Sequence, residues 1–136
     1  MDAGSIRQFS LIIQSLSCNA PLPTPGTVPD GVSGIPLTVT ASGPDLTLAW
    51  GASCNASGVD YAIYQGTLGT YFSHAIKFCT TQGLLTKTFP ADPGDLYFLV
   101  VPLTADREGS YGKDSASVER PPAGPACKPQ LTGSCP

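Results

Sequence analysis

The sequence predicts an all-β protein, a seven-stranded antiparallel sandwich of immunoglobulin type with extended N- and C-terminal arms. The 136 residues include 15 glycines and 14 prolines, which interrupt the chain too often for long helices because glycine costs backbone entropy and proline removes a donor. Segments that alternate apolar and polar residues recur with turn signals roughly every 8 to 12 residues, as in a sandwich. A hydrophobic content of 41% supplies a core and argues against disorder.

Seven segments carry the strand pattern. In order they are residues 37–41, 46–50, 59–63, 71–78, 85–89, 96–103 and 110–118. The first two are joined by Ser42-Gly43-Pro44-Asp45 and predict a hairpin with one buried face. Residues 96–103 are apolar on both faces, which indicates a central strand.

Composition divides the chain into four parts. An apolar segment (residues 1–20) precedes a proline-rich linker (21–35), the sandwich (36–120) and a tail rich in proline and cysteine (121–136). The linker should favour extended polyproline II, which is semi-rigid, and could span roughly 45 Å. We expect the tail to be irregular chain held by disulfides.

A family resemblance rests on the second and sixth predicted strands. Trp50 ends the second, and Pro93-Gly94-Asp95-Leu96-Tyr97 opens the sixth. These residues resemble a fibronectin type III domain over residues 33–120. Residues 60–66, 108–115 and 119–121 resemble more narrowly the modules repeated in large bacterial extracellular proteins. The resemblance implies a tyrosine corner, in which the Tyr97 hydroxyl bonds an upstream backbone group. Most such modules have no assigned chemistry.

The five cysteines indicate the compartment. None has Cys-x-x-Cys spacing, and one histidine is too few for a mixed zinc site. We therefore expect disulfides in a secreted, extracellular or cell-surface protein; five reduced cysteines in a cytosolic domain are the alternative. Strand order favours a bond from Cys54 to Cys79. Cys127 and Cys135 are eight residues apart and could bond within the tail, which leaves Cys18 unpaired or intermolecular. A bond from Cys18 to Cys127 or Cys135 stays open.

Charge and motifs argue against several function classes. The seven lysines and arginines are scattered, so no basic stripe exists for nucleic acid. No apolar run reaches the roughly 18 residues of a membrane span. The single histidine, His74, lacks a nucleophile elbow or zinc motif, and we interpret it as a strand-edge residue with a local hydrogen bond. We expect no enzyme activity, no cofactor and no metal site.

Acidic residues flank one long predicted turn. Asp106, Glu108 and Asp114 could in principle form a glycosidase pair or a calcium site. We interpret them instead as solvated loop charges balanced by Arg107 and Lys113.

Aromatic residues offer a possible sugar-binding surface. The candidates are Tyr64, Tyr71, Phe72 and Tyr111, with Tyr64 and Tyr111 preferred. Cross-strand packing is the competing interpretation. Asn55-Ala56-Ser57 also matches the N-glycosylation acceptor pattern in a predicted loop.

The N-terminal segment supplies the functional hypothesis. Its apolar residues are Phe9, Leu11, Ile12, Ile13 and Leu16. They fit a strand, and less well a short helix. Such a strand could add to the sheet edge of another copy and build a filament; it could equally pack on its own sandwich or end a preceding domain.

The sequence thus predicts a non-enzymatic extracellular structural or adhesive module. Its expected partners are copies of itself or neighbouring domains of a longer chain. The alternative is an accessory carbohydrate-binding module of a secreted hydrolase, with a polysaccharide as its partner.

Overall fold

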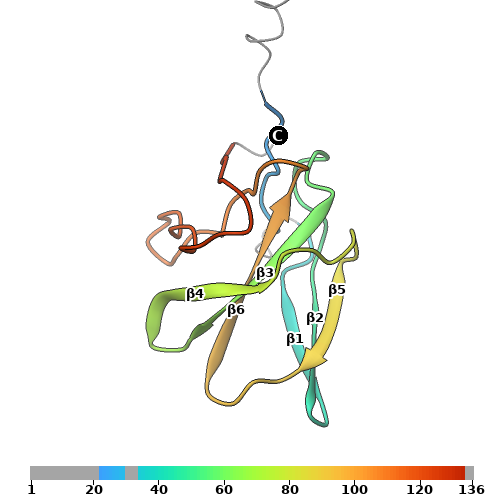
Figure 1. The fold of residues 1–136 in the computed structure, drawn as a ribbon, viewed down its shortest axis with the longest axis vertical. Coiled ribbons are helices and arrows are strands. Elements are labelled where there is room, and N and C mark those ends of the chain that lie inside the picture. The colour runs from blue at the N-terminus through green and yellow to red at the C-terminus, as the bar shows by residue number, and fades with distance from the viewer. Residues whose placement is uncertain (1–21, 30–33, 134–136) are drawn as a thin grey trace, which may run out of the picture.

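Six strands form the protein in a computed structural model that describes residues 22–29 and 34–133 (Figure 1). They are β1 (Thr38–Ser42), β2 (Asp45–Ala49), β3 (Asp60–Thr67), β4 (Thr70–Phe78), β5 (Thr86–Pro90) and β6 (Leu96–Leu103). The described residues contain no helix, and therefore none that could cross a membrane. The all-β prediction and its first six strands are confirmed.

The strands form two antiparallel sheets of three strands each. One has the order β1-β2-β5 and the other β4-β3-β6. A core lies between the sheets (Figure 1) and contains the buried side chains of Leu48, Trp50, Tyr61, Ile63, Phe89 and Val100. The apolar alternation of the sequence therefore places one face of each sheet against the other.

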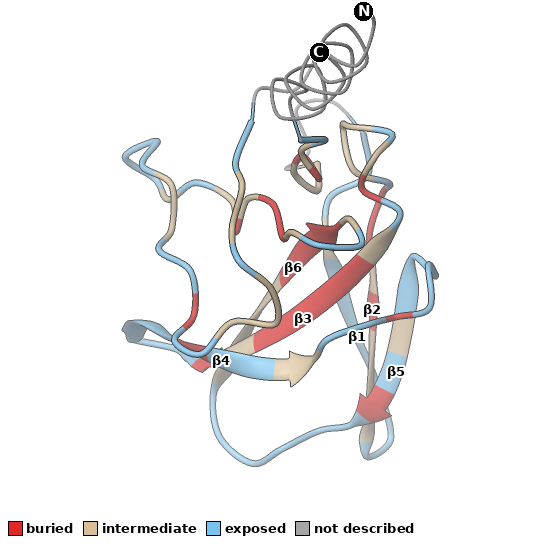
Figure 2. Ribbon diagram, turned by 45° about the horizontal axis from the view of Figure 1, so that its top comes forward, coloured by how far each residue is buried: buried red, intermediate tan, exposed pale blue. Residues whose placement is uncertain are grey.

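Strand β3 is buried on both faces (Figure 2). Tyr61 and Ile63 enter the core between the sheets. Ala62 and Tyr64 point the other way, into a second buried cluster with Val101 of β6, because successive side chains of a strand alternate between faces. The second cluster lies beneath the C-terminal arm, so this arm is part of the packed structure.

Strand β1 does not have the buried face that was predicted for the first hairpin. All five of its residues are exposed, and Val39 retains 50% of its accessible surface. Leu48 of β2 is fully buried instead. The hairpin itself is confirmed, with Gly43 at φ 59° in its turn.

The predicted seventh strand does not form. Residues 110–118 instead make a local turn, in which the Asp114 carboxylate accepts hydrogen bonds from the Ala116 and Val118 amides at 2.9 and 3.0 Å. Short acidic side chains capture nearby backbone donors in this way and so compete with strand pairing. Gly112, at φ 86°, bends the chain further. Strand β6, which was predicted to be central, consequently lies at the edge of its sheet among the described strands, and β3 is the central strand.

The described part of the predicted linker, residues 22–29, packs on the sandwich. Pro25 and Gly26 are buried. The Gly26 carbonyl accepts from the Ser110 amide at 2.9 Å, and the Thr27 carbonyl accepts from the Cys54 amide at 3.0 Å. These residues are therefore attached to the sandwich, because the domain satisfies their backbone groups.

Candidate functional site

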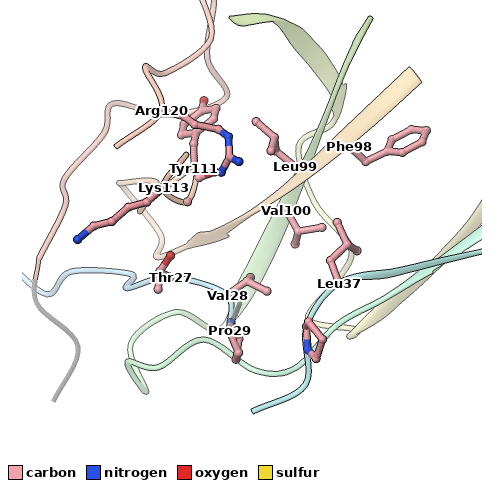
Figure 3. A pocket seen from close by; sticks show the side chains of 12 residues that line it. Thr27, Val28, Pro29, Leu37, Phe98, Leu99, Val100, Tyr111, Lys113 and Arg120 are labelled. Carbon is pink, nitrogen blue, oxygen red and sulfur yellow. Dashed lines mark hydrogen bonds between the residues drawn. The ribbon is translucent and has the colours of Figure 1, made fainter. Parts of the chain in front are cut away.

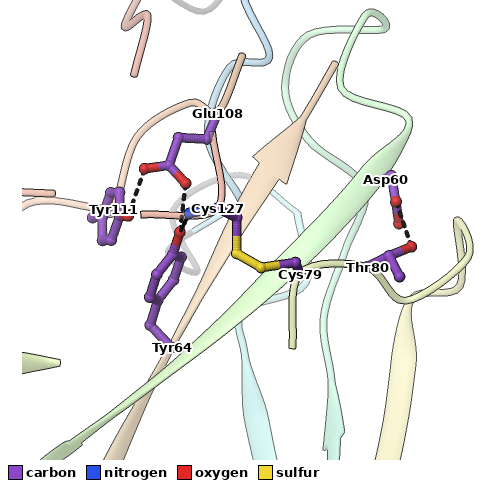
Figure 4. Close-up of a disulfide and its surroundings, with 7 residues drawn as sticks. All are labelled: Asp60, Tyr64, Cys79, Thr80, Glu108, Tyr111 and Cys127. Atoms are coloured by element: carbon purple, nitrogen blue, oxygen red, sulfur yellow. Dashed lines mark hydrogen bonds between the residues drawn. A yellow bond between two sulfur atoms is a disulfide. The ribbon is translucent and has the colours of Figure 1, made fainter. Parts of the chain in front are cut away.

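A buried carboxylate holds the C-terminal arm against the outer face of β3 (Figure 4). Glu108 is 0% exposed. The Tyr64 hydroxyl donates to Oε2 of Glu108 at 2.6 Å, and the Tyr111 hydroxyl donates to Oε1 at 2.5 Å. Tyr64 also accepts from the Cys127 amide at 2.8 Å. A buried carboxylate is tolerated only when hydrogen-bonded, and these contacts join the sheet, the loop after β6 and the arm.

Glu108 was expected to be a solvated loop charge, and that expectation is wrong. Its backbone amide donates to the Pro129 carbonyl at 2.9 Å, and its carbonyl accepts from the Leu131 amide at 2.8 Å. The arm thus runs beside Glu108 and removes it from solvent. This path is not evident from the sequence, since a proline-rich segment has no periodic pattern that reveals what it packs against.

Both phenols of this cluster are protonated at neutral pH, and burial keeps them protonated above the pH at which an ordinary tyrosine ionises. Burial, together with the hydrogen bond to Glu108, raises the pKa of Tyr64 to about 12, against the opposing effect of the Cys127 amide. Burial and the bond to Glu108 also raise the pKa of Tyr111 far above its ordinary value. Both hydroxyls are therefore donors to the carboxylate, and the cluster holds the C-terminal arm in place.

Tyr64 and Tyr111 do not form a sugar-binding surface. They are 0% and 2% exposed, and their rings lie 4.8 Å apart. The argument from strand alternation was correct about which face Tyr64 occupies, but it could not show that the arm covers this face. Among the other candidates, Tyr71 and Phe72 are exposed, with 65% and 57% of their surface accessible.

His74 of the edge strand β4 is buried beside this cluster. Its Nδ1 lies 3.1 Å from the Tyr97 hydroxyl, and its Nε2 lies 2.8 Å from the Pro121 carbonyl. Its ring centroid is 5.4 Å from that of Tyr111. The expectation of a local hydrogen bond is wrong, because both partners are distant in the sequence, and Nε2 gives the arm a further attachment.

Tyr97 is not a tyrosine corner of the expected kind. Its hydroxyl contacts His74 across the sheet rather than a backbone group upstream. The ring lies over Gly66, where an added Cβ would approach the ring to 2.4 Å. A side chain at Gly66 would displace Tyr97, which explains why strand β3 carries a glycine at this position.

The disulfide pairing differs from the predicted one. Cys79 bonds Cys127, with Cα atoms 5.5 Å apart (Figure 4). The predicted partners, Cys54 for Cys79 and Cys135 for Cys127, are therefore wrong. The arm crosses the β4-β3-β6 sheet and brings Cys127 to the end of β4, a path set by the Glu108 cluster. Cys54 is also disulfide-bonded, whereas Cys18 and Cys135 lie outside the described residues.

Asn55 is half-buried and has a structural role. Its side chain donates to Thr24 Oγ1 at 3.1 Å and accepts from the Ser57 amide at 3.0 Å. These bonds attach the N-terminal arm to the loop before β3. Glycosylation of Asn55 stays a prediction, and it would require the bond to Thr24 to break.

Asp60 organises the turn after β4, a role that the sequence did not indicate. Its carboxylate accepts from the Thr80 hydroxyl at 2.6 Å and from the Thr81 and Gly83 amides at 3.1 and 3.0 Å. Burial acts to raise the pKa of Asp60, but these hydrogen bonds prevail and lower it. The side chain is thus committed to the fold.

A groove of about 320 Å³ lies along the edge of β6 on the described surface (Figure 3). We call this the β6 groove. Its apolar lining comes from Val28, Pro29, Leu37, Phe98 and Val100, and Lys113 and Arg120 lie at its other side. Tyr111, Gly112 and Lys113 belong to the predicted seventh strand, and they line this groove without pairing with β6. The groove is not evident from the sequence, because it exists only where residues 110–118 do not form that strand.

The described residues contain no group of three or more side chains that could hold a metal ion. The predicted self-assembly segment, residues 9–17, lies outside the described residues. No family model matches the chain, and no curated protein or solved structure is significantly similar to it.

Proposed function

We propose that this chain is a non-enzymatic, extracellular structural or adhesive module that associates with copies of itself by donating an N-terminal strand. The observation that carries the proposal is the unpaired edge of β6 beside an apolar groove. An exposed sheet edge is a template for another chain, and extended peptides use such edges for recognition. The segment with residues 9–17 supplies a strand of suitable pattern.

The strand order supports the resemblance to a fibronectin type III domain. Sheets ordered β1-β2-β5 and β4-β3-β6 are consistent with an immunoglobulin-like sandwich that lacks its last strand. The Cys79 to Cys127 disulfide supports an oxidising setting, since disulfides persist mainly outside the cytosol. Outside the cytosol this disulfide would stabilise the module, because the C-terminal arm that it holds is otherwise irregular chain.

Self-association is tested with charge substitutions in the full chain. Leu11→Asp with Ile13→Asp places charge on one face of the predicted strand, and Ser10→Asp with Gln14→Asp places equal charge on the other. Sedimentation velocity over a range of concentrations then measures assembly. We expect the wild-type chain to form large species, the first variant to stay monomeric and the second to keep assembling.

Two results would contradict the proposal. One is a wild-type chain that stays monomeric at high concentration. The other is equal loss of assembly in both variants, which would mean that added charge rather than the strand pattern matters.

A second candidate function is binding to polysaccharide, as in an accessory module of a secreted hydrolase. The observation that favours it is the exposed pair Tyr71 and Phe72 near the β3–β4 turn, with the Tyr71 ring 6.0 Å from Tyr97. Exposed aromatic faces stack on pyranose rings. Retention on insoluble polysaccharide should fall for Tyr71→Ala and stay unchanged for Val39→Ala, a half-exposed apolar control. Unchanged retention for both variants would exclude this function.

A further inference from the structure

We infer that the β6 groove is the acceptor site of this assembly, and that residues 9–17 of a second copy occupy it as the missing seventh strand of the sandwich. The inference rests on the proposed function and identifies the surface that receives the donated strand.

The edge of β6 directs some of its backbone N–H and C=O groups away from β3. The Pro102 carbonyl accepts from the Gly109 amide at 2.8 Å, so Pro102 directs its carbonyl away from β3. Because strand geometry repeats every two residues, Val100 and Phe98 also direct their N–H and C=O groups outward. The described residues outside the sheet make no backbone hydrogen bond to either residue. Two donors and two acceptors are therefore open to a strand beside β6.

The side chains at the same positions define the face that a donated strand would share. Phe98 and Val100 point into the core between the sheets, and Val28 and Leu37 pack against that core. A strand paired with β6 would direct every second side chain to this face. Phe9, Leu11 and Ile13 have that spacing, so they would extend the core into the groove.

The charge of the donor segment also suits an apolar groove. No charged residue occurs between Arg7 and Asp30. The segment therefore brings no ionised side chain that would have to be desolvated against Val28, Leu37 and Phe98. Lys113 and Arg120 lie at the side of the groove, where they can remain in water and discourage an alternative cationic partner.

The anchoring of the N-terminal arm favours a second copy over the same chain. Thr24 is held by Asn55, and the arm then runs through Gly26 to Val28 and Pro29 in the groove wall. The described arm thus joins the groove wall at Thr27 to Pro29, after it has passed Thr24. To fill its own groove, the segment would have to turn back within the six residues between Ser17 and Thr24. A neighbouring copy requires no reversal, and such a head-to-tail contact propagates.

The test uses charge in the groove of the full-length chain. Leu37→Arg and Val28→Arg each place a cation on the apolar wall of the β6 groove. Leu37 lies just before β1, and Val28 lies in the N-terminal arm outside any strand. Val39→Arg is the matched control, since Val39 lies two residues from Leu37 and is half exposed. Circular dichroism and Trp50 fluorescence confirm that each variant is folded. We expect both groove variants to sediment as monomers and the control to assemble.

Mixing variants identifies the contact. A Leu37→Arg chain keeps its donor strand, and a Leu11→Asp, Ile13→Asp chain keeps its groove. Their mixture should give one-to-one dimers that grow no further, with a mass equal to the sum of the two chains. Assembly that survives both folded groove variants would overturn the acceptor site while leaving the proposed function intact. A wild-type chain that never assembles would overturn both.

Discussion

Removing the Tyr64 hydroxyl should cost far more stability than removing the Tyr61 hydroxyl. Both tyrosines belong to β3, and they are 0% and 2% exposed. The Tyr61 hydroxyl accepts one hydrogen bond from the Ser53 amide at 2.9 Å. The Tyr64 hydroxyl accepts an equivalent bond from Cys127 and also donates to Glu108. Phenylalanine at either position keeps the ring and deletes only the oxygen.

The expected costs follow from these partners. Tyr61→Phe leaves one partly buried amide without its acceptor, which costs about 1 kcal/mol. Tyr64→Phe does the same at Cys127 and also removes a bond to a buried carboxylate, worth about 1.5–3 kcal/mol. Its total is therefore about 3 kcal/mol, roughly 2 kcal/mol more than for Tyr61→Phe.

Urea unfolding followed by circular dichroism and by the single tryptophan, Trp50, measures both variants. A double-mutant cycle with Glu108→Gln assigns the difference, because the excess cost at Tyr64 should shrink when the charge is gone. Equal costs for the two tyrosines would refute the conclusion that Glu108 and Tyr64 anchor the arm.

Two further predictions concern the same arm. Replacing Cys79 and Cys127 by serine opens a loop with a sequence separation of 48. In the chain-entropy model this should lower the free energy of unfolding by about 4 kcal/mol. A loss below about 1 kcal/mol, measured by urea unfolding, would contradict the prediction. The pKa values of Tyr64 and Tyr111 are raised in the folded state. The contribution of the two protonated phenols to stability is complete below pH about 10, where tyrosine in the unfolded chain is also protonated. It is lost as the pH rises towards about 12. Stability should then fall by about 1.4 kcal/mol per pH unit for each tyrosine, and an absorbance titration that shows all tyrosines ionising together near pH 10 would oppose this.

Local pattern was enough to locate most of the strands. Alternation along residues 96–103 and 46–50 predicted β6 and β2 closely, because one face of each strand must be apolar to join the core. The same rule failed over residues 110–118. There Gly112 and Asp114 favour a turn, and an alternating pattern of small residues carries too little apolar surface to outweigh that local preference.

The candidate site was only partly predictable. The donor pattern at Phe9, Leu11 and Ile13 is a property of the sequence, whereas the groove that would receive it depends on the absence of a strand beside β6. The exposure of Tyr71 and the burial of Tyr64 follow from the course of the C-terminal arm. Strand alternation assigns a face to each residue but says nothing of what covers that face.

The sequence by itself determined an all-β chain with cysteines suited to disulfides and an apolar N-terminal segment, since these follow from composition and short-range periodicity. Tertiary structure alone decided that Cys79 pairs with Cys127, that Glu108 is buried, and that β6 has an open edge. Each of these depends on contacts between segments far apart in the chain. The arm has no periodic pattern of its own, and its course is set by the phenols and the carboxylate that it meets on β3 and in the loop after β6.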